Sequence, residues 1–153
     1  MNDGTAYPMK LITFKVVHHG QARTAVNPWL MLMAPENFVE LSTADATRLG
    51  VETGDQVRVT SASNTVGITG KAKVNPGLKP GVVAIAHHFG HWELGSRPHT
   101  VNGVQTGFDP SRGAGIHPGT VMRRDQRSTS VPLQDPIGAS CSFYDTSVQV
   151  TRV

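Results

Sequence analysis

The chain has 153 residues, of which 38% are hydrophobic and 16% are charged, and this length predicts one globular domain rather than several. Its 14 lysines and arginines exceed its 11 aspartates and glutamates by only three. A net charge of +3 without a long basic run excludes the charge pattern of a nucleic-acid-binding protein. The 16 glycines and 10 prolines predict an ordered domain that is rich in turns.

The single cysteine, Cys141, excludes an internal disulfide bond and an iron–sulfur cluster held by this chain. We expect its side chain to be buried as a small apolar group. The first ten residues lack the apolar core of a signal peptide, and no apolar stretch reaches the length of a membrane span. The sequence therefore predicts no direct membrane contact, and it leaves the compartment open.

Short apolar runs bounded by Gly, Pro and Asn predict a mainly β fold. Alternation at Val57 and Val59 predicts that one face of their strand is buried. Short strands at this spacing favour a small barrel. In chain order, we expect strands over residues 9–17, 38–41, 56–61, 66–74, 82–86 and 143–153.

A short helix is expected over residues 42–50, and it is the one helix that the pattern predicts firmly. A Ser or Thr would cap its N-terminus, Asp45 lies near the positive end of the helix dipole, and Gly50 would end it. Asn27 and Pro28 predict a turn, which Asn27 could stabilise through hydrogen bonds to the backbone.

Residues 87–132 form a long irregular loop in this interpretation, and a loop of that length inside one domain is typically functional. It contains five of the seven histidines, and the remaining two lie in the loop that follows the first strand. Imidazoles at strand ends donate hydrogen bonds to anionic or heteroaromatic ligands. Arg23, Thr24 and glycine-rich backbone amides would add a phosphate cradle. The alternative is that Arg23 is solvated and the histidines pack at the rim of the barrel.

Two catalytic interpretations have little support in the sequence. His87 and His91 have the spacing of a zinc-binding pair, but that motif needs a helix and a Glu beside the first His, whereas His88 and Gly90 stand here. Gly95-Ser96 matches the self-cleaving pair of a pyruvoyl-dependent decarboxylase, yet the dipeptide has almost no specificity. We therefore predict neither a catalytic residue nor a metal ligand in this chain.

Several segments together resemble the C-terminal molybdopterin dinucleotide-binding domain of the dimethyl sulfoxide reductase superfamily. The Asn27-Pro28-Trp29 motif is most similar to the polysulfide, thiosulfate and tetrathionate reductase branch. The resemblance extends over essentially the whole chain, 1–153, as a single cofactor-capping domain. The segments that carry it are Tyr7 to Thr13, His18-His19-x-x-x-Arg23-Thr24, Asn27 to Leu30, Val39 to Ser61, Lys79 to Val83, Val131 to Leu133, Asp135 to Gly138, and Phe143 to Val148.

The resemblance implies a double-psi β-barrel with one or two short helices, which closes over the bis(molybdopterin guanine dinucleotide) cofactor of a molybdenum or tungsten oxidoreductase. The metal ligand and most of the cofactor site would belong to the remaining catalytic domains or subunit, so this chain alone would not be catalytic. By matching position, the resemblance assigns cofactor contacts to Thr13, Lys15, His18, His19, Gln21, Arg23, Thr24, His87, His88, Gly90, His91, Trp92 and His117.

One segment departs from the family pattern. Family members commonly carry asparagines in a Gly-x-x-Asn-Pro-Asn-like segment, where this chain has His117 and Gly119. A neutral imidazole still donates one hydrogen bond and accepts one, but Gly119 has no side chain.

A second interpretation keeps the barrel and replaces the cofactor with a peptide or protein partner, as in the N-terminal domains of some unfolding ATPases. An exposed apolar patch over residues 29–33 would favour such a free-standing module. In the cofactor-capping interpretation, the same patch would contact a neighbouring domain or subunit.

Overall fold

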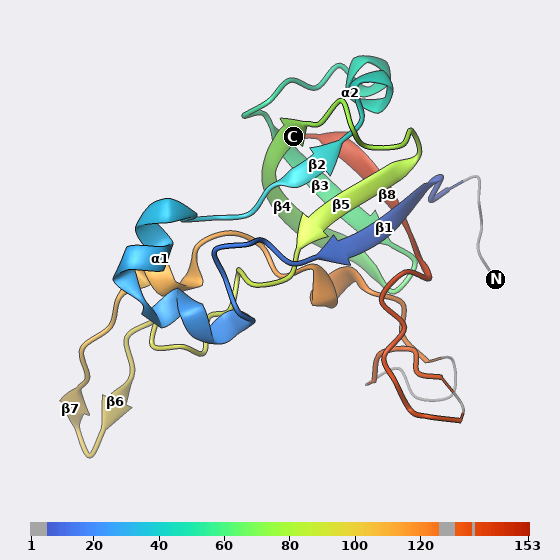
Figure 1. Cartoon of the computed structure of the whole chain (residues 1–153). Helices are drawn as coiled ribbons and strands as arrows, with labels where there is room; N and C mark the ends of the chain where they lie inside the picture. Colours follow the sequence, from blue (N-terminus) through green and yellow to red (C-terminus); the bar gives the residue numbers. More distant parts are fainter. Residues whose placement is uncertain (1–5, 126–130, 136) are drawn as a thin grey trace.

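Six strands close into a barrel in the computed structural model, which describes residues 6–125, 131–135 and 137–153 (Figure 1). Two neighbouring pairs are parallel, β1 with β5 and β2 with β4, and the other four pairs are antiparallel. This closed mixed sheet confirms the predicted double-psi β-barrel. Around the barrel the strands are β1 (Met9–Phe14), β5 (Val82–Ala86), β2 (Val39–Leu41), β4 (Asn64–Val74), β3 (Gln56–Ser61) and β8 (Thr146–Arg152).

The barrel interior is filled by side chains that alternate along the strands. Met9 and Leu11 of β1 are buried, as are Val57 and Val59 of β3, which confirms the predicted face. Two predicted strands are too long. The first ends at Phe14 rather than at residue 17, and the last begins at Thr146 rather than at residue 143.

The predicted helix over 42–50 is α2 (Thr43–Leu49), and its ends are those that the sequence predicts. The hydroxyl of Ser42 accepts a hydrogen bond from the Asp45 N–H at 3.1 Å. Gly50 ends the helix in the left-handed conformation, with φ +63°. Burial alone would raise the pKa of Asp45, but hydrogen bonds from Ser42 and the Gly81 N–H, together with Arg48, hold that pKa below its ordinary value.

A second helix, α1 (Pro28–Met33), stands where the sequence predicts only a turn. Asn27 caps it, because its side-chain oxygen accepts hydrogen bonds from the backbone N–H groups of Trp29 and Leu30. Pro28 at the first helical position favours the same start. The helix follows the 3-10 turn η1 (Ala22–Val26), and both lie to one side of the barrel (Figure 1).

A small apolar cluster joins this side to the barrel. Ala25 of η1 and Met31 of α1 pack with Ala86 at the end of β5 and with Phe89 beyond it. The loops after β1 and β5 are therefore held by a core of their own.

The segment 87–132 is more regular than the sequence predicts. It contains a hairpin, in which Asn102 and Gly103 both have positive φ, as the tight two-residue turn requires. Residues 126–130 of the segment lie outside the described residues. The regular elements are β6 (Thr100–Val101), β7 (Val104–Gln105), and the 3-10 turns η2 (Pro110–Gly113) and η3 (Pro118–Val121).

Cys141 is exposed, so the expectation that it is buried was wrong. It lies between residues 131 and 145, where none of the described side chains is buried. Among the described residues, no helix combines the length and the apolar character that a membrane span needs.

Candidate functional site

The two histidine-bearing loops leave the barrel at the same end. β1 and β5 are parallel neighbours, and Phe14 lies opposite Ala86 in their last aligned pair. The His87 N–H donates a hydrogen bond to the Phe14 carbonyl at 3.3 Å. Because parallel strands end at the same edge of a sheet, the loop after β1 and the loop after β5 start side by side.

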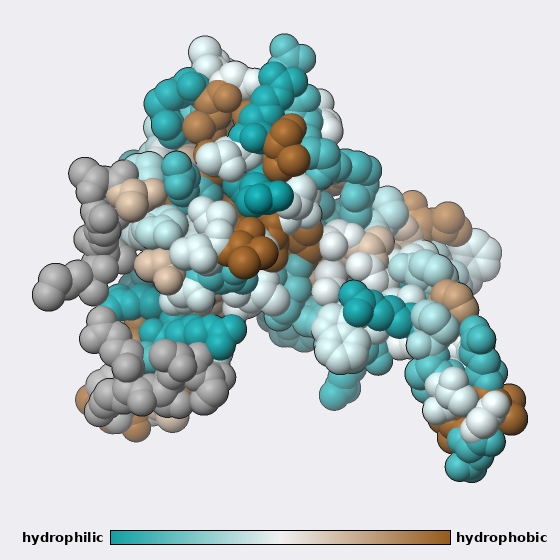
Figure 2. Space-filling view, turned by 180° about the vertical axis from the view of Figure 1, so that it is seen from behind, coloured by the Kyte–Doolittle hydropathy of each residue, from teal (hydrophilic) through white to brown (hydrophobic). Residues whose placement is uncertain are grey.

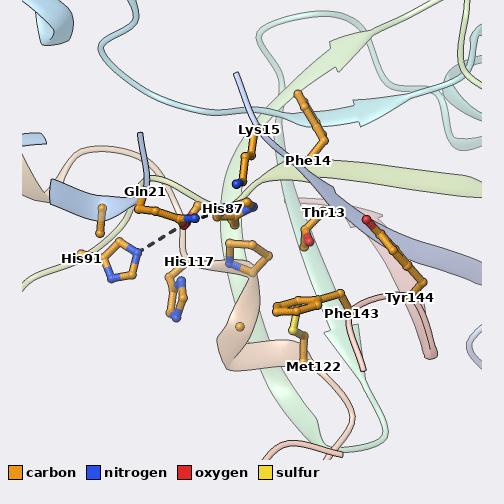
Figure 3. Close-up of a pocket in the computed structure, with 13 residues that line it drawn as sticks. Thr13, Phe14, Lys15, Gln21, His87, His91, His117, Met122, Phe143 and Tyr144 are labelled. Carbon is orange, nitrogen blue, oxygen red and sulfur yellow. Dashed lines mark hydrogen bonds between the residues drawn. The ribbon is translucent and has the colours of Figure 1, made fainter. Parts of the chain in front are cut away.

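A cavity of about 710 Å³ opens at this edge, which is a volume typical of small-molecule sites. Figure 3 shows a polar side, with Gln21, His91 and His117, and an apolar side, with Met122 and Phe143. The lining residues come from four stretches of the chain: Thr13, Phe14 and Lys15; Gln21 and Ala22; His87, His91, His117, Pro118, Gly119 and Met122; and Phe143 and Tyr144.

The structure brings six of the thirteen predicted contact residues to the wall of this cavity. Two come from the end of β1, one from the start of η1, and three from the segment after β5. They are Thr13, Lys15, Gln21, His87, His91 and His117.

The polar wall consists of imidazoles held by specific partners. The rings of His91 and His117 lie with their centroids 4.4 Å apart. His87 Nε2 lies 3.1 Å from the side-chain oxygen of Gln21, and His91 Nδ1 lies 3.0 Å from a carboxylate oxygen of Glu93. His117 Nδ1 is buried and has no hydrogen-bond partner among the described residues.

Burial and repulsion by neighbouring positive groups disfavour the charged forms of His87 and His117. Burial lowers the pKa of His87, and positive charge on Lys15 and His91 lowers it further. The pKa of His117 is lowered by burial first and then by His91 and His87, against an opposing effect of Glu93. At neutral pH, therefore, His87 and His117 act as neutral hydrogen-bonding groups beside Lys15.

Two other predicted residues, His19 and His88, are buried and hold the first loop in place. His19 Nε2 donates to the Ala34 carbonyl at 2.8 Å, and His19 Nδ1 hydrogen-bonds the hydroxyl of Thr24 at 2.8 Å. His88 Nε2 accepts the Val16 N–H at 3.1 Å. This bond turns the chain away from the sheet beyond Phe14. His19, Thr24 and His88 thus position the cavity, although they do not line it.

The remaining predicted contacts lie outside the cavity lining. His18 and Arg23 are exposed on the first loop. Trp92 is 62% exposed, with the Arg97 guanidinium 5.7 Å from its ring centroid. These assignments stay predictions.

Gly90, also predicted as a contact, has a packing role. Its φ is +75°, and a Cβ at this position would lie 2.4 Å from the backbone N of His117. The loop after β5 and the segment around His117 are therefore pressed together, backbone against backbone. This approach brings His117 to the cavity even though the family's asparagines are absent.

Sequence reasoning missed the apolar wall. Phe143 and Tyr144 precede β8, which runs antiparallel to β1 with Thr146 opposite Leu11. The start of β8 therefore lies beside the end of β1, and two aromatic residues directly before a terminal strand were a signal for this wall. The other missed lining residues are Phe14, Ala22, Pro118, Gly119 and Met122.

The arrangement suits the binding of an anion next to a flat ring. No set of three His, Cys, Asp or Glu side chains in residues 6–125, 131–135 and 137–153 is placed to hold a metal ion. One wall offers a lysine and imidazole N–H groups to an anion, while the opposite wall offers aromatic and thioether surfaces to a flat ring.

A family model and two curated proteins match this chain, and all three concern molybdopterin enzymes or reductase subunits. The family model described as "Molydopterin dinucleotide binding domain" matches residues 9–121. A selenate reductase subunit of Mesobacillus selenatarsenatis is 44% identical over 155 aligned residues, which cover 94% of this chain and 15% of that protein. A tetrathionate reductase subunit of Salmonella typhimurium is 38% identical over 72% of this chain and 11% of its own length. The chain thus spans less than a sixth of these relatives.

A solved structure agrees on the fold. Acetylene hydratase from Pelobacter acetylenicus superimposes with a TM-score of 0.72 over 99% of this chain and 19% of its own chain. Its sequence identity is 16%, so this similarity concerns the architecture alone.

Proposed function

This chain belongs to the molydopterin dinucleotide binding domain family, and we propose that its histidine-lined cavity is where it contacts a molybdopterin guanine dinucleotide cofactor. The observation that carries the proposal is the meeting of Lys15 and three imidazoles with an aromatic wall in one cavity. Phosphates and a flat heterocycle are the two chemical features of such a cofactor, and the two walls match them.

The cavity fits one part of the cofactor rather than all of it. Its volume of about 710 Å³ is in the range of a single small ligand. The buried, unpartnered Nδ1 of His117 is consistent with a wall that lacks its ligand, because buried ring nitrogens are ordinarily satisfied.

In the proposed assignment, Thr13, Lys15, Gln21, His87, His91 and His117 contact the cofactor directly. His19, His88 and Gly90 hold those residues in place. Thr24 supports His19 through its hydroxyl, and His18, Arg23 and Trp92 would contact the more distant parts of the cofactor or the rest of the enzyme.

We further propose that residues 1–153 form the cofactor-capping domain of a larger oxidoreductase, in which other domains or subunits share the two dinucleotides and supply the metal ligand. The cofactor, with molybdenum or tungsten, would supply the oxidation–reduction chemistry. The relatives' names differ in substrate, selenate in one and tetrathionate in another. The shared domain is therefore proposed to recognise the cofactor and not the substrate.

An exposed apolar face on α1 supports a contact with the rest of such an enzyme. Trp29, Leu32 and Met33 are 75%, 76% and 64% exposed, whereas Met31 between them is buried. The view from behind shows further hydrophobic residues scattered among hydrophilic ones on that side of the molecule (Figure 2). The face matches the predicted patch, and we assign it to the neighbouring domains rather than to an unrelated peptide.

Binding of cofactor fragments to the purified chain tests the cavity. GDP-mannose presents guanine and a pyrophosphate esterified at both ends, and neopterin presents a pterin ring. We expect at least one of them to bind with a Kd of about 1 mM or tighter. Backbone resonances of Lys15 and Phe143 should shift in NMR titrations, while those of Val101 on the distant hairpin should not. If neither fragment perturbs the cavity, the assignment is wrong.

A further inference from the structure

The polar wall of the cavity contains three imidazoles, which can each gain a proton, and one lysine. His87, His91 and His117 all line it, and Lys15 is the lysine among them. The ring centroids of His91 and His117 are 4.4 Å apart. Without a ligand, charging any of these imidazoles places positive charge beside the others.

We propose that an anionic ligand binds in this cavity together with protons, which are taken up by His87 and His117, so that the ligand is held more tightly as the pH falls. This inference rests on the proposed function, because it concerns the same cavity. It adds that His87 and His117 become positively charged when the anionic ligand binds. In the free chain they are neutral.

Burial and the positively charged neighbours of His87 disfavour its charged form in the absence of a ligand, and they outweigh the opposing effect of the Phe14 backbone. Lys15 reaches it from the end of β1, and His91 and His88 reach it from its own loop, the latter with ring centroids 4.5 Å apart. Gln21, from the start of η1, provides a neutral acceptor at 3.1 Å. Burial and the positive neighbours lower the pKa of His87.

His117 is surrounded similarly, with one difference. His91 and His87 repel its charged form, and burial does so more strongly. The carboxylate of Glu93 attracts it, but this carboxylate is already 3.0 Å from His91 Nδ1. The net effect is a lowered pKa for His117.

A pyrophosphate in the cavity reverses this balance. Its negative charge stabilises the imidazolium form of His87 and His117 and leaves their neutral form almost unaffected, so their pKa values rise in the complex. Thermodynamic linkage then requires proton uptake on binding wherever the pKa in the complex exceeds that of the free chain. The ammonium group of Lys15 on the same wall adds a further attraction for the anion.

Calorimetric titration of the 153-residue chain with GDP-mannose tests the coupling. Both phosphates of this probe are esterified, so its charge is constant between about pH 6 and about pH 8. Repeating the titration in buffers of different ionisation enthalpy gives the number of protons taken up. We expect net uptake at about pH 6.5 and a Kd about five- to tenfold lower at about pH 6 than at about pH 8. Guanosine, which is uncharged over this range, should bind without proton uptake.

Paired variants assign the protons. H87Q combined with H117Q should abolish most of the pH dependence and still bind through Lys15. H99Q is the matched control, because His99 lies on the exposed hairpin and hydrogen-bonds Thr106, and it should keep the full dependence. Ring resonances of the wild-type histidines, followed with and without GDP-mannose, give the same answer without a variant.

The outcomes separate the two proposals. Binding with the same Kd at every pH would overturn the proton coupling and leave the cofactor contact intact. Undiminished pH dependence in the double variant would overturn the assignment to His87 and His117. Absence of binding by both GDP-mannose and neopterin would overturn the proposed function, and the coupling with it.

Discussion

Asn37 and Ile116 are joined by two hydrogen bonds of 2.8 Å, although they lie 79 positions apart in the chain. The Asn37 side chain donates to the Ile116 carbonyl and accepts from the Ile116 N–H. It also donates to the carbonyl of Ala86 at 2.6 Å. One buried amide therefore ties the last residue of β5 to the segment that carries His117.

Replacing Asn37 with alanine should be strongly destabilising. The substitution leaves two carbonyls and one N–H buried without partners, at a cost of about 2–4 kcal/mol in the free energy of unfolding. Urea denaturation monitored by circular dichroism measures this loss. Q105A, on the exposed hairpin, should change the free energy of unfolding by less than about 0.5 kcal/mol. A loss for N37A as small as that of the control would contradict the role of this amide.

Gly90→Ala tests the close approach between the two loops. A Cβ there would meet the His117 N at 2.4 Å in a backbone with φ +75°, so steric overlap adds to conformational strain. G81A is the matched control, because Gly81 has φ +83° and no atom within 4 Å of its Cβ position. We expect G81A to cost about 1 kcal/mol and G90A to cost clearly more. Equal losses in thermal or urea unfolding would show that the contact is unimportant.

Gly119→Ala should affect the cavity more than the fold. The added Cβ would lie 2.7 Å from Nε2 of His117, and the ring has room to move because it borders the cavity. We expect a loss of GDP-mannose affinity of about threefold or more, with a change in unfolding free energy below about 1 kcal/mol. Ligand titration and urea denaturation of the same variant distinguish the two effects. Unchanged affinity and an unchanged His117 ring resonance would refute the prediction.

Without ligand, the fold should lose stability on mild acidification. The pKa values of His87, His88 and His117 are lowered in the folded chain, in each case chiefly by burial. Below about pH 6.5 the unfolded chain therefore binds more protons than the folded one, and the free energy of unfolding falls. The contribution of these histidines to the decline should end once the pH is below their folded-state pKa values.

Urea denaturation at a series of pH values between about 8 and about 5 follows this decline. Replacing His117 with glutamine should reduce its slope. The corresponding variant of His18, which is exposed, should retain it. A free energy of unfolding that is independent of pH across this range would show that the histidines titrate alike in both states.

Strands and α2 were predictable because their signals are local. Alternation at Val57 and Val59 indicates one buried face, and Ser42 and Gly50 mark the two ends of a helix. The helix α1 was missed because Asn27-Pro28 fits both a turn and a helix start. The Asn102-Gly103 hairpin signal was overlooked inside a segment that was interpreted as irregular.

The site was predictable only in part, for a related reason. Lys15 and His87 directly follow two strands that the sequence identifies. If those strands are assumed to be parallel neighbours, both residues must lie at the same end of the barrel. His19 and His88 belong to the same motifs, yet their hydrogen bonds turn them inward. The position of His117 depends on Asn37, and no local pattern indicates a pairing over 79 positions.

The closure of the barrel by β8 has a consequence for folding kinetics. β8 pairs with both β1 and β3, and Lys10 hydrogen-bonds Ser147 across 137 positions. Contacts this distant in sequence form slowly, because the entropy of the intervening chain opposes them. Phe143 and Tyr144 directly precede β8, so this wall of the cavity depends on the pairing of β8 with β1. A chain in which β8 had not yet paired would present the imidazoles without the aromatic wall, so under the proposed function the cofactor site would be complete only after the barrel has closed.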